Sequence, residues 1–242
     1  GTEDGGRPPP GMGMPGLRSS VSRLRSLPDW AGLTLSATAA VYLHNLALFF
    51  LAALGLSALP RPKVFARVAA AGAVALALWL PWLIHLPGQF AKVQQAYWVT
   101  RPDALSLLQT ALVFHAGEEL LEAKFALGLA LFTSVSLPAL LLFQLARERD
   151  RRAGWLIALA GGTPVLLFAA SLVQPVYVQR ALLPAGLAYW AALGWLLAGS
   201  HMPVVLRRGL AVLLAACMIA GLWAHATFRQ FPRSDFPALT AW

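Results

Sequence analysis

The chain has 242 residues, of which 58% are hydrophobic and only 12% are charged. Soluble domains have about 25% charged residues, so this composition excludes an ordinary soluble domain and predicts an all-α, polytopic integral membrane helix bundle. The net charge of +9 comes from residues at the ends of apolar runs, with no basic stripe interleaved with aromatic residues, and does not predict nucleic acid as a partner.

The two ends of the chain differ in composition from its centre. Residues 1–28 are rich in Pro, Gly, Ser and Arg, which is typical of a disordered or linker-like segment. The apolar runs lie within residues 29–230, the predicted transmembrane domain, and a polar segment, residues 231–242, follows. The chain begins with Gly1 and has no signal-peptide pattern. We therefore expect it to be a fragment of a larger protein.

The first apolar run, residues 31–59, has basic residues at both ends. Two arginines precede it, and Arg61 and Lys63 follow it. Basic residues favour the cytoplasmic side, so one straight span of about 43 Å would leave one pair on the wrong side of a core of about 30 Å. A short helix hairpin with residues 42–45 at its outward apex satisfies both pairs. A single tilted span is the alternative.

Five further runs have the roughly 17–25 residues that a membrane span needs. They are residues 64–86, 125–146, 155–173, 181–198 and 209–226. Basic clusters fill only every second gap, which predicts that these gaps face the cytoplasm; they contain Arg61, Lys63 and Arg67, then Arg147, Arg149, Arg151 and Arg152, then Arg207 and Arg208. The other gaps and the C-terminus are then expected outside.

The outer segment 87–124 is too polar to cross a membrane. Asp103 is a predicted N-cap for ALSLLQTALVFHAG, whose apolar face predicts an outer helix lying in the membrane interface. Before it, Gln89, Lys92 and Trp98 could bind a sugar through polar groups and an aromatic platform. The alternative is that they form the solvated face of an interfacial segment.

Arg180 is the first candidate for a binding residue. It follows Tyr177 in a short outer loop and immediately precedes a span. A guanidinium group at this position can form bidentate, charge-assisted hydrogen bonds with a lipid-linked phosphate. The alternative is an arginine that reaches ordinary lipid headgroups.

His44, with Tyr42 and Asn45, is the second candidate. An ionisable residue inside an apolar segment indicates function, and an apex would direct it to the outer surface. The alternative is a hydrogen-bonded core histidine. His115 and Glu119, one helical turn apart in HAGEELLEAK, could hold a divalent metal or supply a base. The alternative is a solvated helix start, so they are weak metal candidates and no cofactor is predicted with certainty.

Motifs for soluble nucleotide chemistry are absent: the sequence has no GxSxG, Walker loop, GxGxxG or CxxC. Outside the hairpin, the predicted spans also lack ionisable residues at their centres, where transporters commonly bind substrate and ions. Polar groups gather at one interface instead. This distribution favours chemistry on a lipid headgroup over translocation.

Three segments carry a resemblance to a known family. WAGLTLSATAAVYLHNLALFFLAAL is similar to a short helix pair whose junction often reads Tyr-Thr-His-Tyr or Leu-Thr-Lys-Gly; Tyr42 and His44 match the first form, while Leu43 and Asn45 depart from it. WLPWLIHLPGQFAKVQQAYWVTRPDALSLLQTAL is similar to the helix end and outer segment that follow, with matches at Pro81, Gln89 and Trp98. QPVYVQRALLPAGLAYWAALGWLLA resembles a helix start reading Arg-Tyr-Leu-Leu-Pro, with Ala181 in place of tyrosine and matches at Arg180, Leu182, Leu183 and Pro184.

In this order the segments resemble the later half of bacterial C-type glycosyltransferases, the family of protein O-mannosyltransferases and lipid A aminoarabinose transferases. The likeness covers roughly residues 30–242. It implies an inverting transferase of the bacterial inner (plasma) membrane that moves a sugar from a polyprenyl-phosphate donor to a lipid, glycan or protein acceptor on the extracytoplasmic face. The closing FRQFPRSDFPALTAW is similar to the lead-in to an exported C-terminal domain.

The resemblance also assigns roles to residues. Arg180 would bind the donor phosphate, and the substrate cavity would be lined by Tyr42, His44, Asn45, Gln89, Lys92, Trp98 and Tyr177. The family's catalytic carboxylate lies upstream of this likeness, so the catalytic residue is unknown and the chain alone is expected to be inactive. The alternative function is a non-catalytic polytopic protein, either a lipid-headgroup transporter or an assembly subunit. Membrane lipids are partners in either case, and no oligomeric state is predicted.

Overall fold

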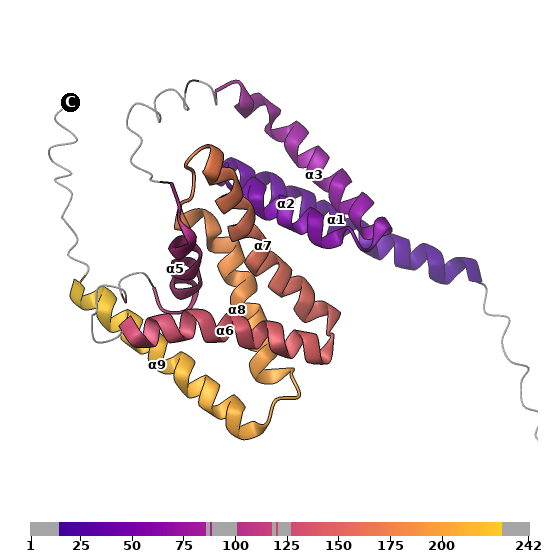
Figure 1. Cartoon of the computed structure of the whole chain (residues 1–242). Helices are drawn as coiled ribbons and strands as arrows, with labels where there is room; N and C mark the ends of the chain where they lie inside the picture. The colour runs from indigo at the N-terminus through magenta and orange to yellow at the C-terminus, as the bar shows by residue number, and fades with distance from the viewer. Residues whose placement is uncertain (1–14, 86–87, 89–100, 118–119, 121–126, 229–242) are drawn as a thin grey trace, which may run out of the picture.

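The computed structural model describes residues 15–85, 88, 101–117, 120 and 127–228, without the side chains of residues 15–28, 127, 180 and 228. This part of the chain folds into helices and contains no strand. In chain order the elements are α1 (Pro15–Leu43), α2 (Ala47–Ala58), α3 (Pro62–Leu83), α5 (Ala104–His115), α6 (Leu127–Glu148), α7 (Arg151–Val173), the 3-10 helix η3 (Gln179–Leu182), α8 (Leu183–Ala198) and α9 (Val204–Phe228) (Figure 1). The predicted all-α fold is confirmed, and α1 begins inside the segment 1–28 whose composition is linker-like.

Four of the described helices, α3, α6, α7 and α9, are long and apolar enough to cross a membrane. The fifth predicted span corresponds to α8, which has only 16 residues. At 1.5 Å per residue it is about 24 Å long, shorter than a bilayer core of about 30 Å. Helix α8 begins only at Leu183 because the preceding residues form the 3-10 turn η3, and Pro184 lies in the first turn of α8.

Large apolar side chains cover the outside of the bundle. On α9, Val212, Ile219 and Leu222 share one face and are 69 to 71% exposed. A continuous apolar face of this kind is unfavourable in water but is solvated by lipid chains. Length, composition and surface together define a multi-pass membrane protein.

The predicted hairpin is confirmed by two contacts between α1 and α3. At one end the guanidinium carbon of Arg67 lies 5.7 Å from the centre of the Trp30 ring. At the other end the Tyr42 hydroxyl donates a hydrogen bond of 2.8 Å to the Leu78 carbonyl. Helices α1 and α3 therefore run parallel, and α2 returns between them after a turn at residues 44–46.

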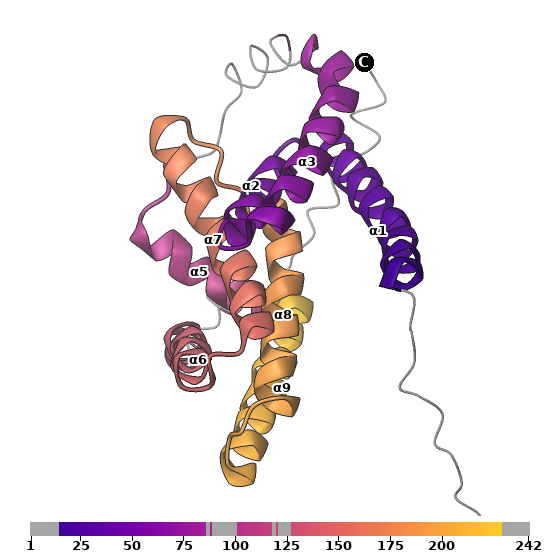
Figure 2. The same cartoon turned by 90° about the vertical axis from the view of Figure 1, so that its right-hand side faces the viewer.

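Helix α8 lies at the centre of the second group of helices, α5 to α9. Its buried residues are mainly small and let neighbouring helices approach closely; they include Ala185, Gly186, Ala188 and Ala192, of which Gly186 faces Phe114 of α5. On another side of α7 the first group is joined through α2, where Ala53 packs against Gly162. Helix α6 crosses α8 at a steep angle, as the two perpendicular views show (Figures 1 and 2).

Hydrogen bonds connect the three basic turns to one another. The Trp155 indole of α7 donates to the Ser57 hydroxyl near the end of α2, at 2.7 Å. The Trp195 indole near the end of α8 donates to Asp150 at the start of α7, at 3.1 Å. The backbone N–H of His201 donates to Glu148 at the end of α6, at 2.7 Å. The basic gaps of the sequence therefore lie together at one end of the bundle, which we call the basic end.

Candidate functional site

The end of the bundle opposite the basic end brings three separate segments together. The hairpin turn and the start of α2 contribute Leu46 and Phe49, which pack in the same apolar cluster as Tyr177 and Leu182. Phe114 of α5 joins this cluster. The turn that contains His44 and the segment that contains Arg180 are thus neighbours, although the sequence separates them by more than a hundred residues. We call residues 44–46 and 174–182, together with α5, the candidate site.

Tyr177 is fixed by α5 and α7. Its hydroxyl forms a hydrogen bond of 2.6 Å with the Thr110 hydroxyl, and its ring meets Phe168 edge-on at 6.2 Å between ring centres. Burial raises the pKa of Tyr177, although the bond with Thr110 opposes this shift. Tyr177 is therefore a neutral, well-positioned side chain in the loop before Arg180.

The bond between Thr110 and Tyr177 can be tested by a double-mutant cycle. We expect Thr110→Val and Tyr177→Phe each to lower the free energy of unfolding by about 1 kcal/mol, because each removes the hydrogen bond between these two hydroxyls. The double variant should lose about 0.5 to 1 kcal/mol less than the sum of the two. Thermal unfolding of the four proteins in one detergent measures this coupling. Strict additivity would contradict the bond.

Arg180 lies in η3, a single 3-10 turn between the loop and α8. The turn is closed by the Ala181 N–H, which donates to the Val178 carbonyl at 3.1 Å. The loop before it is held by the Val176 N–H, which donates to the Ser171 hydroxyl at 3.2 Å. The backbone of Arg180 is thus fixed at the start of α8, and its side chain lies outside the described part of the structure.

The three residues predicted at the hairpin turn differ in their contacts and exposure. Tyr42 is tied to α3, because its hydroxyl donates to the Leu78 carbonyl. His44 is exposed, and its Nδ1 accepts the Leu46 N–H at 3.3 Å. Asn45 is half-buried beside it. Of the three, His44 is the one that presents an open polar group at this end.

The outer segment is described only in part. Gln89, Lys92, Trp98 and Glu119 lie outside the described residues. The predicted N-cap at Asp103 is confirmed: its carboxylate accepts the Ser106 N–H at 2.9 Å, and the Ser106 hydroxyl accepts the Asp103 N–H at 3.1 Å. The hydrogen bond from the Ser106 side chain is the main reason that the pKa of Asp103 is lowered.

His115, the weak metal candidate, is a buried core residue of α5. With its proton on Nδ1, the ring donates to the Ala111 carbonyl at 2.6 Å, and Nε2 lies within hydrogen-bond distance of the Thr133 hydroxyl of α6, at 3.0 Å. Both ring nitrogens are thereby engaged. Among the described residues, no group of three or more His, Cys, Asp and Glu side chains is placed to hold a metal ion.

The sequence interpretation missed an apolar cavity of about 550 Å³ that borders the candidate site. It lies between α5, α6, α7 and α8, where α6 diverges from its neighbours (Figure 1). Thr110 and Phe114 form part of its wall, so the cavity touches the residues that hold Tyr177 and η3. Two prolines inside apolar helices, Pro138 and Pro164, also line it. These prolines were the available sequence signal, because proline disturbs close helix packing.

Fold and site together define the class: an all-α, multi-pass membrane protein with an apolar cavity beside the segment that contains Tyr177 and η3. Comparison with protein-family models, with curated proteins and with solved structures found no match for this chain.

Proposed function

We propose that the chain forms the donor-binding part of a membrane glycosyltransferase that transfers a sugar from a polyprenyl-phosphate to an acceptor on the extracytoplasmic face of a bacterial inner membrane. The observation that carries this proposal is the apolar cavity beside the turn that contains Arg180. A polyprenyl-phosphate has a long apolar tail and one anionic group, and this end of the bundle offers a complement to each.

The apolar part of the donor fits the cavity between α5 and α8. A volume of about 550 Å³ falls within the roughly 300–1,000 Å³ typical of ligand sites, and suits several isoprene units but not a whole polyprenyl chain. The rest of the tail would lie in the bilayer. Phe114 connects the two regions, since it lines the cavity and also packs with Ala181 and Leu182 of η3.

The phosphate would then lie near η3. A guanidinium group neutralises a phosphate through two parallel hydrogen bonds, and Arg180 is the basic residue of this turn. In the proposed reaction the acceptor oxygen bonds to the anomeric carbon while the bond from that carbon to the phosphate oxygen breaks. The polyprenyl phosphate leaves with the electron pair, and a base takes the acceptor proton. Arg180 would stabilise the charge that develops on the departing phosphate.

The test uses the natural full-length protein and two lipids that differ only in the phosphate. We expect Arg180→Ala to weaken binding of undecaprenyl phosphate by about 10- to 100-fold, the loss of one charge-assisted contact. Binding of undecaprenol, which has the same tail and no phosphate, should not change. Native mass spectrometry of the detergent-solubilised protein measures both, and sugar transfer from polyprenyl-phosphate sugars should fall in parallel.

Arg101→Ala is the matched control, because Arg101 is an exposed arginine just before α5. It should bind undecaprenyl phosphate as the unaltered protein does. Unchanged phosphate binding in the Arg180 variant would contradict the assigned role. Normal phosphate binding with no sugar transfer from any donor would favour the non-catalytic alternative, a lipid-headgroup transporter or an assembly subunit.

A further inference from the structure

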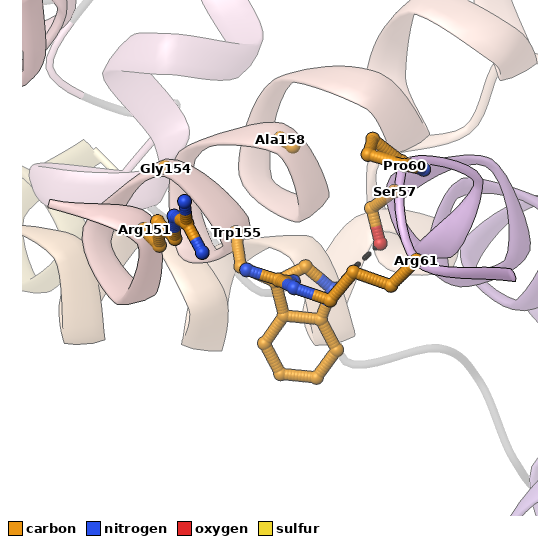
Figure 3. Close-up of a pocket in the computed structure, with 7 residues that line it drawn as sticks. All are labelled: Ser57, Pro60, Arg61, Arg151, Gly154, Trp155 and Ala158. Carbon is orange, nitrogen blue, oxygen red and sulfur yellow. Dashed lines mark hydrogen bonds between the residues drawn. The ribbon is translucent and has the colours of Figure 1, made fainter. Parts of the chain in front are cut away.

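A second pocket, of about 390 Å³, lies at the basic end, on the opposite side of the bundle from the candidate site. The α2–α3 turn forms one wall, and the first turns of α7 form the other (Figure 3). The residues that line it are Ser57, Pro60, Arg61, Arg151, Gly154, Trp155 and Ala158. Two of these seven residues are arginines, and the proposed transferase reaction uses neither of them; of the seven, only Ala158 also lines the apolar cavity.

A hydrogen bond holds the two walls of this pocket together. The Trp155 indole N–H donates to the Ser57 hydroxyl at 2.7 Å, and that hydroxyl donates to the Leu54 carbonyl at 2.7 Å. Gly154 and Ala158 carry no large side chain, which leaves space along α7. The pocket is therefore a fixed concavity and not a gap between independently moving surface side chains.

Neither arginine of the pocket forms an ion pair with Asp150 or Glu148, the described acidic residues of the α6–α7 turn. Asp150 accepts the Arg152 N–H at 2.7 Å and the Trp195 indole at 3.1 Å. Glu148 accepts the His201 N–H, and its carboxylate lies 3.3 Å from Nδ1 of the same residue. Within the described part of the chain, Arg61 and Arg151 have no ion-pair partner.

Both arginines lie at the N-terminus of a helix, which adds to the positive electrostatic potential of the pocket. Arg61 immediately precedes α3, whose N-terminus has no side-chain cap, and Arg151 is the first residue of α7. The positive end of a helix dipole disfavours a cation and favours an anion. Figure 3 shows Arg61 extending from its turn across the mouth of the pocket, toward the start of α7 where Arg151 lies. Membrane topology explains basic residues at this end, but not their convergence on one pocket.

We propose that this pocket binds the phosphate of an anionic membrane lipid, with the guanidinium groups of Arg61 and Arg151 on the phosphate oxygens. A lipid fits better than a soluble anion because the pocket borders apolar surface. Leu56 and Leu59, in the last turn of α2 and just after it, are each 52% exposed. Trp155 is 40% exposed at the same boundary, the depth at which tryptophan is enriched in membrane proteins. The proposal is independent of the transferase reaction and holds for any function of the opposite end.

The test titrates the purified full-length protein with dioleoylphosphatidylglycerol and counts bound lipids by native mass spectrometry. Dioleoylphosphatidylcholine, which has the same chains and no net charge, is the comparison lipid. We expect one phosphatidylglycerol to bind at least about tenfold more tightly than phosphatidylcholine, and Arg61→Ala with Arg151→Ala to remove that preference. Both side chains are exposed, so the double variant should remain folded, which thermal unfolding checks.

Arg207→Ala with Arg208→Ala is the control for net charge, because these arginines lie in the first turns of α9, next to another basic turn, and do not line the pocket. This variant should keep the preference for phosphatidylglycerol within about twofold. Equal losses in the two double variants would overturn the proposal, since binding would then follow net charge and not the pocket. Displacement of the lipid by an equal concentration of inorganic phosphate would overturn it as well, since the occupant would then be a soluble anion.

Discussion

Replacing Gly221 of α9 with alanine should lower the free energy of unfolding by at least about 3 kcal/mol, the upper part of the range for overpacked sites. An added Cβ would overlap the carbonyl oxygen of Ala116 and lie only 2.7 Å from its carbonyl carbon. The obstacle is the backbone at the end of α5, which cannot rotate away as a flexible side chain can. Helices α5 and α9 would have to separate, opening the apolar cluster of Leu112, Leu120 and Ala224.

Thermal unfolding in detergent measures this effect as a fall in Tm of roughly 6 to 12 °C. Gly209→Ala is the matched control on the same helix, since a Cβ at that position meets nothing within 4 Å. Alanine forms helices more readily than glycine, so the control should keep or slightly raise the Tm. Equal Tm values for the two variants would show that α5 and α9 do not approach as closely as described.

Charge and polarity along the chain were sufficient to predict the hairpin. Basic residues on both sides of one apolar run required the chain to reverse, and the polar residues near its centre indicated where. The contacts of Trp30 with Arg67 and of Tyr42 with Leu78 confirm this reversal. The same rule grouped the basic turns, which hydrogen bonds from α7, α8 and the α8–α9 turn hold at one end. Such predictions succeed because charge placement is decided by the solvent and not by detailed packing.

Contacts between helices that are far apart in the sequence could not be predicted from local sequence patterns. Thr110 and Tyr177 are 67 positions apart, and neither position shows a pattern that indicates the bond between them. The cavity depends on the angle at which α6 crosses its neighbours, which no periodicity encodes. Helix α8 is shorter than its apolar run because the run begins with the turn of η3. For the candidate site, the sequence suggested His44, Tyr177 and Arg180, whose segments the structure brings to one end of the bundle, but not the cavity beside them.

His115 is a second residue whose role could not be predicted locally, because that role depends on its contact with Thr133 of another helix. The pattern of histidine and glutamates on one helix turn suggested a metal site or a solvated helix start. The side chain is instead only 2% exposed, and it bonds to Thr133 on another helix. The ring of Tyr189 lies 6.1 Å from it, centre to centre. Thus an ionisable group is held neutral between α5, α6 and α8.

The expected consequence is a loss of stability in mild acid. Burial lowers the pKa of His115 to about 4, from an ordinary value of 6.5, although the bond to the Ala111 carbonyl opposes the shift. Between these two values the unfolded chain binds a proton that the folded protein does not, so the free energy of unfolding falls as the pH decreases from 6.5 toward 4. A shift of this size corresponds to about 3 kcal/mol. The pKa values of Asp103, Asp150 and Glu148 are lowered from their ordinary 3.8, 3.8 and 4.5, so these carboxylates add to the loss of stability only at the acid end of this window, where the unfolded chain begins to protonate them.

Unfolding of the protein and of His115→Gln, measured in one detergent from pH 7 to 4.5, tests this assignment. Glutamine keeps an amide for hydrogen bonding but does not titrate, so the variant should be less stable at pH 7 and should lose most of the pH dependence. His85→Gln is the control for replacing a histidine elsewhere in the chain, because His85 is exposed beyond the end of α3. A slope that survives in His115→Gln would mean that another group titrates. The neutral His115 would then serve only to join α5 to α6.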